Sequence, residues 1–226
     1  MTTIITEQRR WRVLGGSRAN LYGQVGLRLV DELTGVAPLG RVRSKLYISD
    51  GSGGWRLTGI KAITTASGVL AYPKLERRAV VAGQLARSYR VQIEAEFYRP
   101  FYRASSDGIE FDVFPYNDEN PPQTITQMAR DVTLVPATNY PFPSHIPVFR
   151  GVVMHAGATV VDAEVRVSLI ERVVTDERGA FSLPVRWKAQ NVPFSIDAID
   201  NRTGRTGSIP VKIPNDLGKN KIIPIS

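Results

Sequence analysis

The sequence contains no cysteine and only two histidines, His145 and His155. The absence of cysteine excludes a disulfide scaffold, an iron–sulfur protein, a thiol enzyme and a cysteine-based zinc site. Two histidines that lie apart, one beside a proline-rich stretch and one in an expected strand, nearly exclude sites that need converging imidazoles. We therefore expect no catalytic residue, no metal site and no cofactor.

Long apolar segments are also missing. No run approaches the roughly 18 uninterrupted apolar residues of a membrane-spanning helix. The first residues, 1–16, lack both the apolar core and the small-residue cleavage site of a secretory signal. We expect no membrane span and a cytoplasmic location in the producing cell, with release by lysis, inside a particle, left open.

Sequence motifs of common enzymes are absent as well. The chain has neither a Gly-x-x-x-x-Gly-Lys-Ser/Thr loop nor a Gly-x-Ser-x-Gly nucleophile elbow. Asn117–Asn120 offers the oxygen ligands that calcium requires, but not at EF-hand spacing. Calcium binding stays open, and so, as a separate point, does glycan binding. The chain is predicted not to be an enzyme.

Positive charge exceeds negative charge, with 29 Lys and Arg against 21 Asp and Glu and a net charge of +8. Nucleic-acid-binding proteins concentrate such charge on one helix or face. Here the charge is spread, since residues 1–143 hold 18 basic and 13 acidic groups and residues 144–226 hold 11 and 8. This argues against nucleic acid as the main partner and is typical of a soluble basic protein, with attraction to an acidic partner or surface as the alternative.

Short stretches of alternating apolar and polar residues recur along the chain and predict β-strands. In the clearest one, residues 89–96, apolar side chains alternate with polar or charged ones, which is typical of a half-buried strand. Residues 138–147 carry three prolines, which cannot donate to a sheet and stiffen the chain, so they predict a linker.

We predict an all-β protein of two immunoglobulin-like or transthyretin-like antiparallel β-sandwiches. The predicted organisation is an N-terminal arm (1–20), a first sandwich with insertions (21–137), a proline-rich linker (138–147) and a second sandwich (148–226). The two parts share an order of events: a first strand, a turn into a second strand, a turn from threonine to glycine, an alternating strand and a closing strand. We therefore predict two copies of one small sandwich.

The second copy resembles the carboxypeptidase regulatory-like domain. The resemblance is carried by Arg150-Gly-Val-Val, Ala163-Glu-Val165 and Val174-Thr-Asp-Glu-Arg-Gly-Ala-Phe-Ser-Leu183. That family is a seven-stranded transthyretin-like sandwich, in which the Thr-Asp-Glu-x-Gly-x-Phe stretch is a hairpin between two core strands. The glycine takes a left-handed turn conformation and the phenylalanine fills the core. The resemblance implies a non-catalytic role as a spacer, an assembly module or an adhesive accessory.

A second resemblance concerns the arrangement around the linker. The closing strand Leu134-x-Pro136, the segment Tyr140-Pro-Phe-Pro143 and Arg150-Gly-Val152 are similar to cap-region or rear-end proteins of phage tail-like contractile injection systems. This implies a structural, non-enzymatic component of a multiprotein particle. Two alternatives stay open: a surface or carbohydrate-binding accessory protein, and a weak nucleic-acid-binding protein.

The N-terminal arm is the first candidate protein interface. Arg9, Arg10 and Arg12 surround Trp11, and both residue types are enriched among binding hot spots. The stretch 2–6 is β-prone, so the arm either adds a strand to an exposed sheet edge of an acidic partner or of a neighbouring copy, or is a frayed terminus or a strand of the first sandwich itself. We expect other particle subunits and a homo-oligomer within the assembly as partners.

The second candidate interface follows a strand in the first sandwich. Pro100 is expected to end that strand, because it cannot continue the hydrogen-bond ladder. Phe101 and Tyr102 come next, and we predict that they form an exposed contact patch.

Overall fold

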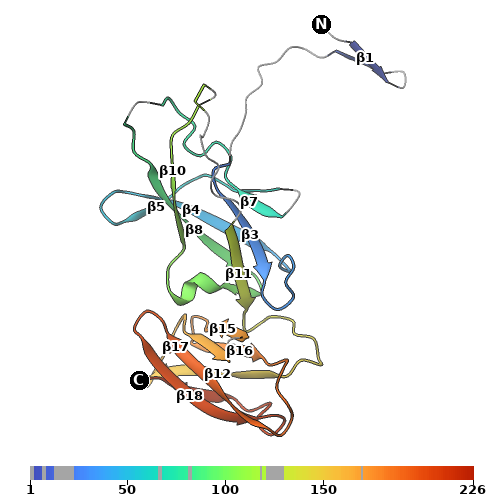
Figure 1. Ribbon diagram of the computed structural model, residues 1–226, viewed down its shortest axis with the longest axis vertical. Coiled ribbons are helices and arrows are strands. Elements are labelled where there is room, and N and C mark those ends of the chain that lie inside the picture. Colours follow the sequence, from blue (N-terminus) through green and yellow to red (C-terminus); the bar gives the residue numbers. More distant parts are fainter. Residues whose placement is uncertain are drawn as a thin grey trace.

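The computed structural model describes residues 3–6, 9–12, 23–65, 68–80, 83–117, 119–120, 130–168 and 170–226, with backbone alone for the first two ranges. It consists of β-strands (Figure 1), and the one helical segment in these residues is the 3-10 helix η1 (Phe101–Ala104). The predicted all-β class is confirmed. In the described part of the chain, no helix is long and apolar enough to cross a membrane.

The predicted arm contributes two short strands, β1 (Thr3–Thr6) and β2 (Arg9–Arg12), which pair antiparallel. Residues 1–2, 7–8 and 13–20 of the predicted arm lie outside the described residues.

The N-terminal half, residues 23–136, forms one curled nine-stranded sheet in the order β5-β4-β8-β9-β11-β3-β7-β6, with β10 paired to β8. The strands are β3 (Gly26–Asp31), β4 (Val42–Ser49), β5 (Trp55–Leu57), β6 (Ile63–Thr64), β7 (Val69–Ala71), β8 (Arg87–Ala95), β9 (Tyr98–Pro100), β10 (Ile109–Val113) and β11 (Arg130–Pro136). The alternation predicted for β8 is confirmed, because Tyr89, Val91 and Ile93 are buried while the residues between them are not.

The C-terminal half, residues 148–226, forms two four-stranded sheets. One contains β12 (Val148–His155), β13 (Ala158–Thr159), β16 (Ala180–Pro184) and β19 (Lys221–Pro224). The other contains β14 (Glu164–Val167), β15 (Glu171–Val174), β17 (Pro193–Asp200) and β18 (Arg205–Lys212). Curled sheets of this kind are consistent with a β-sandwich.

The two halves repeat the same pattern of strand pairing. In the N-terminal half β3 pairs with β7 and β11, β4 pairs with β5 and β8, and β8 pairs with β10. In the C-terminal half β12 pairs with β16 and β19, β14 pairs with β15 and β17, and β17 pairs with β18. Each corresponding pair also has the same direction, which supports the predicted repeat of one small β-sandwich.

One pair in each half is parallel, although antiparallel sandwiches were predicted. The first strand lies beside the last one, so that β3 runs parallel to β11 and β12 runs parallel to β19. Alternation along a strand reports which side chains are buried, and it carries no information on the direction of a strand that is distant in sequence.

The turn that carries the family resemblance is closed by Asp176. Its Oδ1 accepts the N–H of Arg178 and the N–H of Ala180, both at 2.9 Å, and Gly179 has a φ of 69°. Phe181 follows in the core with 2 % exposure. These features agree with the expected roles of the glycine and the phenylalanine. The flanking strands β15 and β16 belong to different sheets, however, so the turn connects two sheets where a paired hairpin was predicted.

The N-terminal half has a matching turn between β6 and β7. The Oγ1 of Thr65 accepts the N–H of Val69 at 3.1 Å, as Asp176 does for the equivalent residue, and Gly68 has a φ of 77°. The N–H of Thr65 also donates to the carbonyl of Val69 at 2.9 Å. Only glycine adopts such backbone conformations without strain, which explains its presence in both turns.

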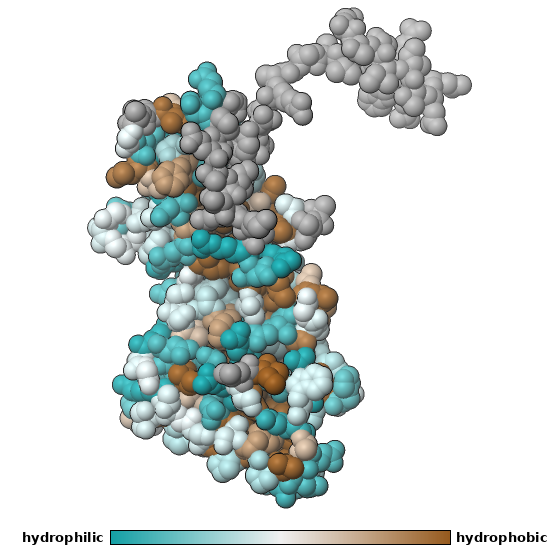
Figure 2. Space-filling model, in the orientation of Figure 1, coloured by the Kyte–Doolittle hydropathy of each residue, from teal (hydrophilic) through white to brown (hydrophobic). Residues whose placement is uncertain are grey.

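Each half encloses its own buried apolar cluster. The N-terminal cluster includes Leu27, Leu46, Tyr72, Val91, Val113 and Leu134. The C-terminal cluster includes Phe149, Val153, Phe181, Leu183, Ile196 and Ile223. The halves are stacked along the longest axis of the molecule (Figure 1), with η1 close to the junction between them. On the face seen in Figure 2, hydrophobic residues lie in small groups among hydrophilic ones.

Candidate functional site

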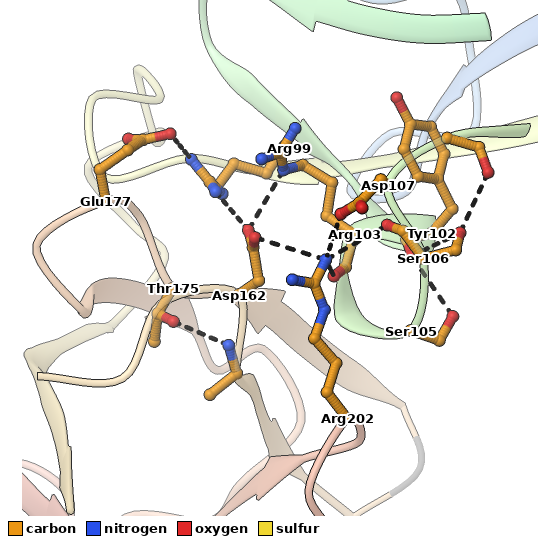
Figure 3. A network of polar contacts seen from close by, with 12 residues as sticks. Arg99, Tyr102, Arg103, Ser105, Ser106, Asp107, Asp162, Thr175, Glu177 and Arg202 are labelled. Atoms are coloured by element: carbon orange, nitrogen blue, oxygen red, sulfur yellow. Dashed lines mark hydrogen bonds and ion pairs between the residues drawn. The ribbon is translucent and has the colours of Figure 1, made fainter. Parts of the chain in front are cut away.

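The junction between the halves is built around one buried carboxylate, that of Asp162. Asp162 precedes β14 in a turn, with a φ of 59°, and is 4 % exposed. Its carboxylate meets the guanidinium groups of Arg99, of Arg103 at 3.2 Å and of Arg202 at 3.8 Å (Figure 3). Arg99 and Arg103 come from the N-terminal half, so this single side chain joins two parts of the chain that have separate cores.

Arg99 is the buried cation of this network. It lies in β9 with 8 % exposure and donates to Asp162 and, at 2.6 Å, to the Oε1 of Glu177. Burial alone lowers the pKa of Arg99, but its bonds to the two carboxylates outweigh burial and raise it. The same bond from Arg99 holds the pKa of Glu177 below its ordinary value. Arg99 is therefore charged, and its Nη1 and Nη2 are bonded to carboxylates of the other half, while its buried Nε has no hydrogen-bond partner among the described residues.

Arg202 extends the network to the loop after η1. Its Nη2 donates to the carboxylate of Asp107 at 3.0 Å and to the carbonyl of Arg103 at 3.1 Å. Arg202 lies after β17, so the turn between β17 and β18 makes a second contact with the N-terminal half, at Arg103 and Asp107.

A second set of polar contacts flanks the junction. Arg172 in β15 donates to Glu32 at 2.9 Å and places its guanidinium 3.6 Å from the centre of the Phe101 ring. Arg186 donates to the carbonyl of Leu33 at 2.8 Å. Burial is the main cause of a raised pKa at Glu32. Between the two polar sets, Ala104, Val135 and Val174 form a small buried cluster with Phe101 packed against it.

The predicted linker is anchored to the N-terminal half. Tyr140 is 6 % exposed and donates its hydroxyl to the carboxylate of Asp31 at 3.0 Å. Asp31 is fully buried and also accepts bonds from Tyr98 at 3.1 Å and from Thr34 at 2.8 Å. Burial, followed by the bond to Asp31, raises the pKa of Tyr140. The proline-rich segment is thus a packed part of the fold at this point.

A cleft of about 460 Å³ opens at the junction. It is lined by Glu94, Glu96, Arg99, Arg103, Asn139 and Glu177, among others. Two of its charged groups bridge the halves, because Arg99 pairs with Glu177 and Arg103 pairs with Asp162, so the arrangement is suited to holding the halves together. Within the described residues, no group of three or more His, Asp or Glu side chains is placed to hold a metal ion.

The second predicted interface lies beside this junction. As expected, β9 ends at Pro100 and η1 begins at Phe101. Both aromatic side chains are half-buried: Phe101 faces the C-terminal half, and the hydroxyl of Tyr102 accepts the N–H of Ile93 at 2.7 Å. They also line a groove of about 230 Å³ next to β10 and β11. Their contact with another protein stays a prediction.

The first predicted interface is described only by its backbone. Arg9, Arg10, Trp11 and Arg12 form β2, which pairs with β1, and their side chains lie outside the described residues. Sequence reasoning missed Asp162 as the centre of the junction. The available signal was weak: one acidic residue between Val161 and Ala163 in a mostly apolar stretch, and two arginines beside an aromatic run.

Comparison of the chain with family models, curated proteins and solved structures finds no match.

Proposed function

We propose that this chain is a non-enzymatic structural component of a multiprotein particle. In this proposal, two β-sandwich domains (21–137 and 148–226) act as one rigid unit, and the N-terminal arm (1–20) and the surface around Phe101 and Tyr102 contact neighbouring subunits. The protein assembles in the cytoplasm of the producing cell and leaves it within the particle after lysis.

The observation that carries the proposal is the junction of the two halves. The Asp162 network, the pair of Arg172 and Glu32, and the apolar contact of Phe101 with Val174 join the two halves by three separate sets of contacts. Buried and hydrogen-bonded charge pairs require exact geometry, because an unpaired buried charge costs several kcal/mol. A joint of this kind suits a part that must keep its shape under load.

The kind of particle is proposed from the sequence resemblance. The segment around the linker is similar to cap-region or rear-end proteins of phage tail-like contractile injection systems, and the second half resembles a domain family with spacer and assembly roles. The repeated pairing pattern supports two modules of that type. Fold alone does not define function, so the particle is the part of the proposal that needs a direct test.

The test is to express the tagged full chain together with its genomic neighbours and to isolate large particles by sedimentation. We expect the chain in the particle fraction, in a fixed ratio to sheath or tube subunits, by mass spectrometry and electron microscopy. An untagged chain expressed alone is the control for nonspecific sedimentation. Specific glycan binding without particles would favour a carbohydrate-binding accessory protein. Salt-sensitive binding to nucleic acid would favour a weak nucleic-acid-binding protein.

A further inference from the structure

Strand β10 is an edge of the N-terminal sheet. Residues Ile109–Val113 pair with β8, and the described residues include no strand on their other side. The neighbouring β11 is paired with β9 only over Leu134–Pro136. One contact spans the gap between β10 and β11: the Nη1 of Arg130 donates to the carbonyl of Glu110 at 3.3 Å. Since alternate residues of an antiparallel strand face opposite sides, the main-chain groups of Glu110 and Asp112 point away from β8. Within the described part of the chain, and apart from the Glu110 carbonyl, they are open to a further strand.

The end of this edge is already capped by a side chain. The carboxamide of Gln24 donates to the carbonyl of Phe114 at 2.7 Å and accepts its N–H at 3.2 Å. These are the two bonds that a neighbouring strand would make. The cap comes directly after β10, so within Ile109–Val113 the outward-facing residues Glu110 and Asp112 form the edge.

A groove beside this edge offers space for one large side chain. It has a volume of about 230 Å³ and is lined by Phe101, Tyr102, Ile109 and Val132 together with Arg130, Asp131 and Thr133. This is smaller than the roughly 300–1,000 Å³ of typical small-molecule sites. Its mixed aromatic, aliphatic and polar lining suits an amphipathic anchor of a protein partner, such as tryptophan.

The edge lies within the most acidic segment of a basic protein. Residues 104–129 contain five acidic residues and no lysine or arginine, although the chain as a whole has a net charge of +8. Glu110 and Asp112 project from β10 and are exposed, with Glu110 paired to Arg90 of β8 at 2.6 Å and Asp112 accepting the hydroxyl of Ser88 at 2.6 Å. The predicted arm has the opposite character, because residues 1–20 contain four arginines and one acidic residue, Glu7.

We propose that the strand Arg9–Arg12 of a second copy of this chain adds to the β10 edge. In an added strand, Arg10 and Arg12 fall on one face and Trp11 on the other, which matches the alternation of Glu110 and Asp112 with the apolar residues of β10. The arginines then meet the two carboxylates, and the tryptophan faces the groove. This inference rests on the proposed role in an assembly.

The arm itself supports this geometry. Its two strands pair with each other, and an isolated two-stranded hairpin is only marginally stable in water. Bonding of β2 to β10 would give a third strand on its open side. Since the arm and the β10 edge are different surfaces, each copy can give one contact and receive another, which produces rings or filaments.

Charge reversal in the full-length chain tests the proposal. We expect the wild type to self-associate in sedimentation velocity at low salt, and the pair Arg10→Glu and Arg12→Glu to weaken this by about tenfold. The pair Arg41→Glu and Arg43→Glu, which changes the net charge equally at exposed positions on the same half, is the control. A monomeric wild type, or an equal loss in the control, would overturn the proposal.

Complementation of two charge-reversed variants gives a second test. The variant with Glu110→Arg and Asp112→Arg should also lose self-association. Its mixture with the variant that carries Arg10→Glu and Arg12→Glu should recover association between the two chains. Failure of the mixture to recover would contradict direct contact between arm and edge.

Cross-linking identifies the copies involved, because the chain has no cysteine of its own. Mixed full-length Arg12→Cys and Glu110→Cys, one of them tagged, should form the mixed disulfide in excess over either homodimer. Arg12→Cys mixed with Ser208→Cys, an exposed position in the C-terminal half, is the control. A single chain that carries both Arg12→Cys and Glu110→Cys distinguishes docking within one chain: a disulfide formed only within monomers, even at high concentration, would overturn the proposal.

These results are separable from the test of the particle. Cross-linked copies without particle association would leave this inference standing and reject the proposed function. A monomeric wild type, together with particle incorporation that charge reversal in the arm or in β10 leaves unchanged, would reject this inference and leave the proposed function standing.

Discussion

The guanidinium of Arg99 and the carboxylate of Asp162 form an ion pair across the junction, although 63 residues separate them in the chain. Their side chains are 9 % and 5 % exposed. A pair with this degree of burial cannot lose one partner without leaving the other charged and desolvated. The stability of the joint therefore depends on both.

Replacement of Asp162 by asparagine should lower the free energy of unfolding by about 1–3 kcal/mol, because Arg99 keeps Glu177 but loses the more buried of its two carboxylates. Urea unfolding measures the change. Asp131→Asn, which removes one partner of the exposed pair of Arg28 and Asp131, is the matched control and should leave the midpoint nearly unchanged. Equal effects of the two substitutions would show that the junction pair is not special.

Addition of a methyl group at Gly151 should force β12 and β19 apart. A Cβ at this position would lie 2.2 Å from the carbonyl oxygen of Lys221, and at Gly207 it would lie 1.9 Å from that of Pro224. We expect Gly151→Ala to cost about 1–3 kcal/mol in thermal or urea unfolding. Gly59→Ala, with no atom within 4 Å of the added Cβ, should change stability by about 0.5 kcal/mol or less.

The contact of Glu177 with Arg99 should make stability depend on pH. The pKa of Glu177 is lowered from its ordinary value of 4.5, so the unfolded chain takes up the proton first as pH falls. We expect the wild type to have a larger free energy of unfolding than Glu177→Gln. This difference should be full above pH 4.5 and should disappear as the pH falls through the lowered pKa of Glu177.

Urea unfolding at several values between about pH 3 and pH 7 measures this difference. Glu32 provides a control of opposite sign, because burial raises its pKa. As the pH falls, the free energy of unfolding of the wild type should rise relative to that of Glu32→Gln. A difference for Glu177→Gln that does not change with pH would count against an ionised contact.

Removal of the Tyr140 hydroxyl should loosen the linker. Tyr140→Phe deprives the buried carboxylate of Asp31 of one donor and is expected to cost about 1–3 kcal/mol in urea unfolding. Tyr47→Phe removes a hydroxyl from a half-buried residue of β4 and should have little effect. Unchanged stability of Tyr140→Phe would show that the other donors to Asp31 suffice.

Much of the fold could be predicted from local features of the sequence. The alternation along residues 89–96 produced β8, Pro100 ended β9, and the Thr175–Gly179 stretch turned between two strands. These features depend on residues that are close in sequence, whose burial and turn chemistry follow simple periodic rules. The all-β class and the repeated order of strands therefore followed from the sequence by itself.

Only the tertiary structure decided which distant groups meet. Asp162, Arg99 and Arg202 converge through the packing of both halves, Tyr140 reaches Asp31 across 109 residues, and the first strand of each half lies parallel to its last. Nothing in the local pattern distinguishes these charges from solvent-exposed ones, because their burial results from surfaces that form only when the halves pack. The carboxylates of β10 likewise do not stand out in the sequence. They lie at a sheet edge only because β10 pairs with β8 on one side.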